Sequence, residues 1–464
     1  MSYDVKDLLS RRNEIMKKSV GIDYDDFELD GIGFDYDKMM NASGYTLDDV
    51  RAIQRRSMVG NTPLIELENL TRYARKFAKP GFGARIFLKD EAANLSGSFK
   101  ARRAAISIHK AKELGYKGVV AATSGNYGAA IAALAAKAGL KCIIVQECFD
   151  SNNVAQPEIL EKARACEAYG AEVLQLSVGP ELFYTFLNVL DETGYFNASL
   201  YSPYGIMGIE TLGYEIVDEM RQKINKDPDV VICTNAGGGN LTGTARGVRK
   251  AGADKTLIYG ASVDLHGLHM ASDKDFNRKS FTTGHTGFGM PFATNPDRSD
   301  VPRSAARPMR YMDKYFTVNQ GSVFFITEAL AVLEGLERGP AGNTSLAVAF
   351  KVAQTMCEDE TIVVQETEYT GAGKHHQPQL SFAKKNGITI RFGNPETEKP
   401  GTDIVFPASA NDIVVKDVDL DRIRKSYLKR FKDYNLTEDD RLFLMEELRV
   451  MDKDKLDALL RQVN

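Results

Sequence analysis

Short runs of β-branched and other apolar residues alternate with longer amphipathic stretches from about residue 60 onward. Such runs, bounded by turn-forming residues, are typical of buried strands, and the stretches between them have helical spacing. The predicted strands cover residues 85–88, 118–122, 141–145, 171–175, 230–233, 257–260 and 361–365. Helices are predicted between them, for example over 129–139 and 157–170. This alternation predicts an α/β fold with parallel sheets and crossover helices.

The two ends of the chain have a different pattern. Residues 1–58 are charged and carry several tyrosines with little periodicity, so we expect an extension that wraps the body or a partner. The chain after about residue 410 is charged and helical. Residues 437–440 resemble a capping box with Leu444, Leu448 and Met451 behind it, which predicts a small C-terminal helical cap.

Composition narrows the class of protein. The 464 residues are enough for two or three domains, and a 43% hydrophobic share with 26% charged residues is ordinary for a globular protein. The net charge of -4 argues against nucleic-acid or membrane-lipid partners. No apolar run approaches the roughly 20 residues that span a bilayer, and the N-terminus has no apolar signal core. We therefore expect a cytoplasmic protein.

The five cysteines form no CxxC pair and are odd in number, so reduced, mostly structural thiols are expected. The six histidines lack HExxH or similar metal-ligand spacing. The sequence therefore predicts no metal site.

A glycine-rich loop follows the predicted strand 230–233 and leads into a helix. Its three consecutive glycines, Gly237, Gly238 and Gly239, let backbone N–H groups turn toward one point, and the helix N-terminus adds partial positive charge. The loop has neither the GKS/T of a P-loop nor GxGxxG. It fits a single phosphate monoester best; the alternative is a flexible turn without a ligand.

A second loop, residues 123–128 (TSGNYG), follows the predicted strand 118–122. The serine and asparagine can simply cap the next helix. Alternatively, backbone N–H groups and Ser124 bind a carboxylate, and the Asn126 amide contacts a ring hydroxyl or phenolate oxygen.

Lys100 follows Ser96, Gly97, Ser98 and Phe99 at the first turn of a predicted helix. Alone it would be read as a solvated surface charge. Desolvation and a positive helix N-terminus lower a lysine pKa, and a neutral amine condenses with an aldehyde. A phosphate cradle, an amide contact and a reactive lysine together describe a site for pyridoxal 5'-phosphate (PLP), a phosphorylated aldehyde.

Five segments resemble, in the right order, those of the fold-type II PLP enzymes, the group of tryptophan synthase β, threonine synthase and threonine dehydratase. They are residues 60–64 (GNTPL), 89–100 (KDEAANLSGSFK), 124–126 (SGN), 237–240 (GGGN) and 340–342 (PAG). The resemblance covers about residues 58–390. It implies that Lys100 is the Schiff-base lysine and the base that removes the Cα proton. The other residues it implies are Asn126, Gly237, Gly238, Gly239, Asn240 and Leu241 for the cofactor, and Ser124, Gly125, Asn126 and Tyr127 for the substrate.

The resemblance also implies two parallel-sheet, three-layer domains with the cofactor in the cleft between them. The expected division is an N-terminal extension (1–58), a large PLP-binding domain (59–98 and 206–400), a small substrate-binding domain (99–205) and a C-terminal helical tail (401–464).

The chain departs from this group after the strand 361–365. The group has a serine or threonine next to glycine there, which hydrogen-bonds the pyridine nitrogen. Thr370, next to Gly371, is the best match, although Glu366 or Thr367 are alternatives. A neutral hydroxyl leaves the nitrogen unprotonated, whereas a carboxylate would protonate it.

A long insert, residues 274–310, has no counterpart in the simple dehydratases. It includes residues 284–289 (GHTGFG) and four arginines, Arg298, Arg303, Arg307 and Arg310. These arginines are candidates for holding a phosphorylated or diphosphate-bearing substrate such as coenzyme A. The alternatives are a solvated loop or a subunit contact.

Taken whole, the chain resembles a thiolytic branch of this group. In that branch a PLP-bearing subunit, acting with a small α subunit, uses coenzyme A to split 2-amino-4-oxopentanoate into acetyl-CoA and alanine during ornithine degradation. Homodimerisation is also expected. One alternative is β-elimination or replacement on an amino acid, as in threonine dehydratase or threonine synthase. Another is an inactive regulatory relative, against which the intact Lys100 argues.

Overall fold

The computed structural model describes residues 5–123, 125–179, 181–265, 267, 278–286, 296–297, 300–369 and 376–463. The α-helices are α1 (Val5–Ser10), α2 (Arg12–Val20), α3 (Tyr36–Asn41), α4 (Leu47–Arg56), α5 (Glu68–Arg75), α6 (Lys100–Glu113), α7 (Asn126–Ala138), α8 (Pro157–Ala168), α9 (Glu181–Thr193), α10 (Pro203–Ile224), α11 (Gly239–Lys250), α12 (Gln320–Glu334), α13 (Asn343–Ala353), α14 (His376–Lys385), α15 (Leu420–Leu428), α16 (Glu438–Leu448) and α17 (Lys453–Arg461). Among these residues, no helix combines the length and apolar composition needed to cross a bilayer.

The strands are β1 (Leu64–Glu66), β2 (Arg85–Asp90), β3 (Gly118–Thr123), β4 (Lys141–Phe149), β5 (Glu172–Ser177), β6 (Phe196–Asn197), β7 (Val230–Thr234), β8 (Leu257–Val263), β9 (Lys314–Val318), β10 (Thr361–Glu366), β11 (Thr389–Gly393), β12 (Asp403–Pro407) and β13 (Val415–Asp417). Short 3-10 helices connect them: η1 (Tyr24–Phe27), η2 (Glu91–Ala93), η3 (Leu95–Gly97), η5 (Pro308–Arg310), η6 (Pro395–Thr397), η7 (Ala410–Asp412) and η8 (Lys429–Phe431).

Two main sheets organise the chain, and the predicted α/β class is confirmed. A seven-stranded sheet has the order β1-β2-β10-β7-β8-β9-β13, and a four-stranded sheet has the order β5-β4-β3-β6. All pairs of the smaller sheet are parallel, whereas the edge strands β1 and β13 of the larger sheet run antiparallel to their neighbours. Every strand predicted from the sequence is present; β1, β6, β9, β11, β12 and β13 were not predicted.

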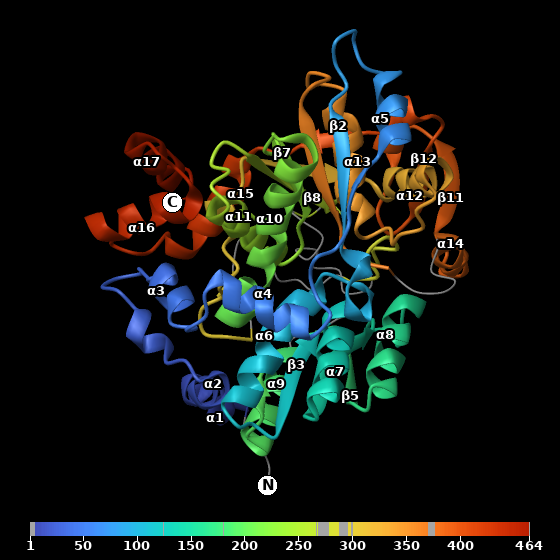
Figure 1. Cartoon of the computed structure of the whole chain (residues 1–464). Coiled ribbons are helices and arrows are strands. Elements are labelled where there is room, and N and C mark those ends of the chain that lie inside the picture. The colour runs from blue at the N-terminus through green and yellow to red at the C-terminus, as the bar shows by residue number, and fades with distance from the viewer. Residues whose placement is uncertain are drawn as a thin grey trace.

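Helices cover both faces of the larger sheet, because its strands are apolar on both sides. Ile86 and Leu88 of β2 pack in one core with α5, α12 and α13. Phe87, which points to the other face, packs in a second core with α10 and α11. Figure 1 shows these two helical layers on either side of β2, β7 and β8.

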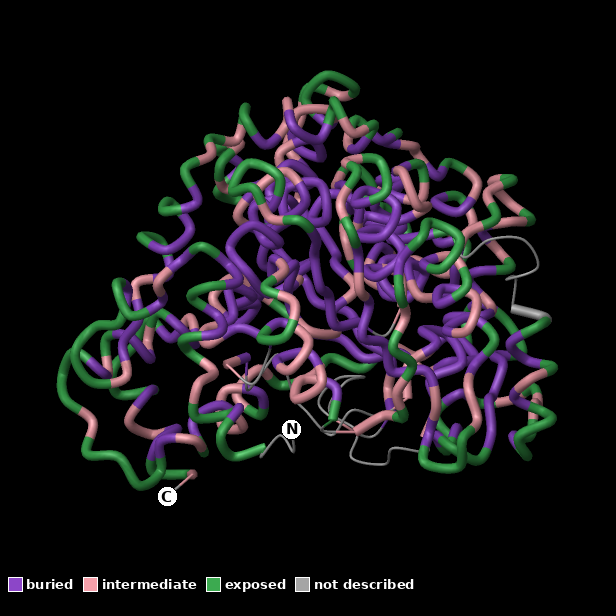
Figure 2. The backbone as a smooth tube through the Cα atoms, turned by 90° about the horizontal axis from the view of Figure 1, so that it is seen from below, coloured by how far each residue is buried: buried purple, intermediate pink, exposed green. Residues whose placement is uncertain are grey.

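The smaller sheet is built in the same way. Val119 and Ala121 of β3 pack with α6 and α7, and Val120 packs with α1, α2 and α9. The tube drawing in Figure 2 shows buried chain through the centre of the molecule and exposed chain at its edge. The boundaries of the predicted domains stay a prediction.

The ends of the chain differ from expectation in detail. The N-terminal extension contains α1–α4, which its weak periodicity did not predict, and it lies on the body of the protein. The predicted capping box is present at Thr437, with Leu444 and Leu448 buried behind it. Met451 instead lies past the helix end and is 90% exposed. The tail is not purely helical, because β12 and β13 belong to it.

A buried ion-pair network joins the motif-bearing segments around the start of α6. Arg102 bonds Glu91 at 2.6 Å and Glu215 at 2.7 Å, and Lys89 bonds Glu215 at 3.2 Å. Thr62 donates to Glu91 at 2.6 Å, which ties the GNTPL segment to the same network. Burial favours a raised pKa for Glu215, but Arg102 and Lys89 outweigh it and lower that pKa to about 2. The network therefore fixes Arg102, which lies two positions after Lys100 on α6.

Removing the guanidinium from this network should destabilise the fold. In Arg102→Met, Glu91 and Glu215 remain buried without their main cation. We expect the free energy of unfolding to fall by about 3–5 kcal/mol, measured by urea denaturation followed by circular dichroism. Lys453→Met is the control, since the Lys453–Glu438 pair is largely exposed, and should cost less than about 1 kcal/mol. Equal losses in both variants would contradict the role of the network.

Candidate active site

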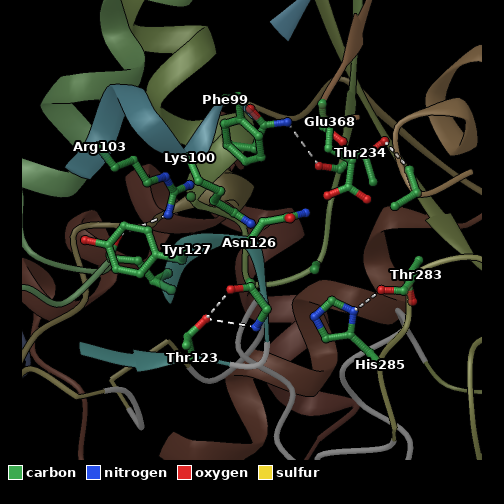
Figure 3. A pocket seen from close by; sticks show the side chains of 18 of the residues that line it. Phe99, Lys100, Arg103, Thr123, Asn126, Tyr127, Thr234, Thr283, His285 and Glu368 are labelled. Atoms are coloured by element: carbon green, nitrogen blue, oxygen red, sulfur yellow. Dashed lines mark hydrogen bonds between the residues drawn. The ribbon is translucent and has the colours of Figure 1, made fainter. Parts of the chain in front are cut away.

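One cavity lies where the carboxyl ends of strands from both sheets approach each other. Thr123 at the end of β3, Thr234 at the end of β7, and Thr367 just after β10 line it. Such edges of parallel sheets are where α/β folds bind ligands. Figure 3 shows Lys100 and Arg103 entering the cavity from one helix, while His285 enters from a separate segment.

A tight turn sets the position of Lys100. Ser96 and Gly97 both have left-handed backbone conformations, with φ of 63° and 70°. The turn is hydrogen-bonded to the chain after β10: the Phe99 N–H donates to the Thr367 carbonyl at 3.0 Å, and the Tyr369 N–H donates to the Gly97 carbonyl at 2.8 Å. Lys100, the first residue of α6, is therefore held beside residues 367–369.

The environment of Lys100 favours the neutral amine. Burial and the nearby Arg103 charge together lower the pKa of Lys100 to about 8, although Glu368 opposes the shift. The side chain is partly accessible from the cavity, although protein surrounds it. Its amine lies 4.7 Å from the centre of the Phe99 ring. Near neutral pH about a tenth of this amine is therefore unprotonated and nucleophilic, far more than for an ordinary lysine.

The three glycines of the loop are required by what packs against them. A side chain at Gly237 would overlap the Tyr201 hydroxyl, and one at Gly238 would overlap Pro308. A Cβ at Gly239 would lie 2.5 Å from Nη2 of Arg103. Gly239 and Asn240 open α11, whose first N–H groups have no acceptor within the helix. Gly237, Gly238, Gly239 and Asn240 line the cavity, and Leu241 is buried behind them.

The loop before α7 forms another wall. Gly125, Asn126 and Tyr127 line the cavity, whereas Ser124 lies outside the described residues. The Gly125 N–H donates to the Thr123 hydroxyl at 3.0 Å. The Tyr127 hydroxyl donates to the Ala198 carbonyl at 2.7 Å. Its hydrogen is therefore already bonded within the protein. The Asn126 side-chain oxygen is buried with no hydrogen-bond partner in the described chain.

The three residues that could contact the pyridine nitrogen, Thr370, Thr367 and Glu366, differ in how the structure places them. Thr370 and Gly371 lie outside the described residues. Thr367 lines the cavity, whereas Glu366 does not and is instead buried against Gly342. Burial raises the pKa of Glu366 well above its usual value, and Glu368 and Asp90 raise it further. Burial therefore favours the neutral form of the Glu366 carboxyl. The contact itself stays a prediction.

Several cavity residues were not given a role from the sequence: Arg103, Glu158, Lys162, Tyr201, His285 and Glu368. His285 stands in the glycine-flanked segment of the insert, which was the one available signal. Burial lowers the pKa of His285 to about 4, and the Lys100 charge adds to this. Burial raises the pKa of Glu368, while Lys162 and Lys100 oppose that shift.

Three of the four insert arginines are paired with carboxylates, which argues against them as the candidate site for coenzyme A. Arg303 pairs with Glu28 at 2.6 Å, and Arg307 and Arg310 both pair with Glu447, at 2.6 and 2.8 Å. Carboxylates of the N-terminal extension and the tail therefore compensate the charges of these three arginines. Arg298 lies outside the described residues.

Comparison with known proteins agrees with this geometry. A family model described as pyridoxal-phosphate dependent enzyme matches residues 56–368. The chain belongs to this family. The 2-amino-4-ketopentanoate thiolase beta subunit of Acetoanaerobium sticklandii is 63% identical over 100% of this chain and 99% of its own length. Threonine synthase of Bacillus sp. strain ULM1 is 31% identical over 66% of this chain and 81% of its own length.

A solved structure supports the fold alone. The crystal structure of O-ureido-L-serine synthase has a TM-score of 0.55 at 18% identity, covering 68% of this chain and 91% of that chain. The expected fold-type II architecture is confirmed by the family match and this likeness. The chain is a PLP-dependent enzyme.

The residues of the cavity fit the cofactor. The glycine loop leaves N–H groups at the start of α11 for a phosphate, and Arg103 is the side chain that approaches Gly239 most closely in the described chain. Asn126 and Asn240 each have a buried side-chain oxygen without a partner among the described residues. The Lys100 amine lines the same cavity. We therefore assign these residues to cofactor binding as a proposal.

The depressed pKa of Lys100 can be measured directly. In the cofactor-free protein its amine should react with acetic anhydride with a midpoint near pH 8, well below the ordinary lysine value of about 10.4. Because Glu368 raises the Lys100 pKa, Glu368→Gln should lower the midpoint. Competitive acetylation followed by peptide mass spectrometry reports each lysine separately, so surface lysines are internal controls. A Lys100 midpoint equal to theirs would contradict the assigned environment.

Proposed function

We propose that the chain is the PLP-bearing subunit of a 2-amino-4-oxopentanoate thiolase. The observation that carries the proposal is the Lys100 amine facing the triple-glycine loop across one cavity, in a chain similar over its full length to a thiolase beta subunit. The reaction transfers the acetyl group of the substrate to coenzyme A and leaves alanine. It would serve ornithine degradation.

The proposed chemistry divides between the cofactor and the protein. PLP supplies an electron sink that stabilises negative charge on the substrate carbons. The Lys100 amine would hold the cofactor and would accept the proton from the substrate Cα. Backbone N–H groups of residues 126 and 127, at the start of α7, would orient the substrate carboxylate, and the glycine loop would bind the cofactor phosphate. These roles need no side chain outside the cavity.

The thiol of coenzyme A also needs a proton acceptor, and we assign that role to His285, whose pKa of about 4 keeps the ring neutral near pH 7. Its Nδ1 lies 2.9 Å from the Thr283 carbonyl, which can only accept, so Nδ1 carries the proton. Nε2 of the neutral ring is then the basic atom. Because a ring with this low pKa is a weak base, the thiol proton moves to Nε2 as sulfur bonds to C4 and the C3–C4 bond breaks. C3 then gains that proton from Nε2, and the Lys100 amine returns to Cα the proton that it removed. Atoms balance: acetyl-CoA and alanine are the only products.

The insert that carries His285 is fastened to the smaller sheet's side of the cavity. Buried Lys279 pairs with Asp150, and the Gln156 amide donates to the His285 carbonyl at 3.2 Å. These contacts hold the ring at the cavity wall. A small α subunit, a homodimer and a cytoplasmic location belong to the proposal; the relatives' name, beta subunit, supports the first.

The reaction can be tested with defined components. The chain mixed with PLP, 2-amino-4-oxopentanoate and coenzyme A, with and without a candidate α subunit, should form acetyl-CoA and alanine in equal amounts. Lys100→Ala should lower the rate by at least about 10³-fold, since it removes both the cofactor bond and the base. Chromatography of both products is the measurement. Ammonia with pyruvate or 2-oxobutyrate from hydroxy amino acids would instead indicate a lyase.

His285→Gln separates thiol activation from proton removal at Cα. Acetyl-CoA formation should fall about 10²- to 10⁴-fold, because the variant lacks the base for the thiol. Exchange of the substrate Cα proton in deuterated water, without coenzyme A, should stay within about twofold, since Lys100 performs it. His109→Gln, outside the cavity, is the matched control. Parallel loss of both activities would assign His285 a structural role.

A further inference from the structure

Arg103 is a buried cation for which the described residues show no carboxylate partner. Its side chain is 2% exposed, and its Nε atom has no hydrogen-bond partner in the described chain. Nη1 donates to the Leu200 carbonyl at 3.2 Å, a neutral acceptor. The adjacent Arg102, by contrast, is paired with two carboxylates. Buried charges are retained in proteins when something compensates them, so Arg103 implies an anion.

The guanidinium lies directly against the glycine loop. If Gly239 carried a Cβ atom, that atom would lie 2.5 Å from Nη2, 2.9 Å from Nη1 and 3.0 Å from Cζ of Arg103. Gly239 is the first residue of α11, a helix of 12 residues whose first two residues, Gly239 and Asn240, line the cavity. Two sources of positive potential, a guanidinium and a helix N-terminus, therefore meet at one point.

The neighbouring side chains in the described chain bring no negative charge to Arg103; the Phe99 ring, whose centre lies 5.5 Å from Cζ, offers only a cation–π contact. Burial lowers the pKa of Arg103 to about 10, opposed only by Tyr127 and Tyr201 among the described residues, and both are neutral near pH 7. Lys100 is a neighbouring titratable cation, and its own pKa falls because of Arg103. A guanidinium bonds phosphate oxygens through a planar fork of donors. The substrate carboxylate has a separate expected place on residues 126 and 127.

We propose that Arg103 is a side-chain ligand of the cofactor phosphate, acting together with the backbone N–H groups of the glycine loop. The inference depends on family membership and on this geometry, and it stands whether or not the enzyme is a thiolase. Arg103 thereby adds charge recognition to a loop that otherwise offers only dipoles.

Comparison of PLP with pyridoxal, which lacks the phosphate, isolates the proposed contact. In Arg103→Gln the dissociation constant for PLP should rise about 10- to 100-fold, as expected for loss of a hydrogen bond between charged groups. The dissociation constant for pyridoxal should change less than about twofold, because pyridoxal has no phosphate for Arg103 to bind. Lys112→Gln, an exposed position on the same helix, should leave both constants unchanged. Titrations followed by absorbance need neither substrate nor coenzyme A, so their outcome is independent of the proposed thiolysis.

Two further measurements distinguish loss of the proposed contact from loss of folding. Arg103→Lys keeps the charge and should weaken PLP binding less than the glutamine variant does. In the wild-type protein with ¹⁵N-labelled arginine, PLP should shift the guanidinium resonances of Arg103, which Arg103→Lys assigns, and pyridoxal should not. Equal weakening of both ligands in Arg103→Gln, unchanged PLP affinity, or equal resonance shifts with both ligands would overturn the proposal. A raised KM for the amino acid with unchanged PLP affinity would assign Arg103 to the substrate carboxylate instead.

Discussion

The buried pairing of Arg102 with Glu91 and Glu215 is the interaction on which the active site depends. Charged groups buried away from solvent are tolerated only when their partners are fixed, so this pairing holds η2, α6 and α10 together. Lys100 precedes Arg102 on the same helical turn and cannot move independently of it. The reactive amine is thus positioned by a neighbour that does not line the cavity.

Much of the fold follows from local sequence, because buried parallel strands are compact β-branched runs separated by helical spacing. β9 was missed although it lies within the larger sheet, since KYFTV mixes charge with apolar residues. β13 is a three-residue edge strand in a charged tail. The helices of the extension were missed for a related reason: α4 begins at a Thr46–Asp49 capping box hidden among acidic residues.

The convergence of Lys100 and the glycine loop on one cavity was predictable, because at both places chemistry and motif coincide within one segment. The active site was not predictable where contacts join distant segments. Glu368 lies beside Lys100 only because the turn before α6 bonds the chain after β10. The insert's arginines looked like an anion site in isolation, yet Glu447, more than a hundred residues away, neutralises Arg307 and Arg310. Spacing alone carries no information about such partners.

The two cations at the start of α6 give the cavity its reactivity. A guanidinium stays protonated under ordinary conditions, so repulsion between Arg103 and Lys100 is relieved by loss of the lysine proton. The amine is therefore most nucleophilic while Arg103 is uncompensated. An anion on the glycine loop would offset that charge and raise the proton affinity of Lys100. Before a phosphate binds to the glycine loop, Lys100 would therefore be the better nucleophile toward an aldehyde. After the phosphate binds, Lys100 would have the higher proton affinity. A lysine that first reacts with an aldehyde and then acts as a base needs these two properties in this order.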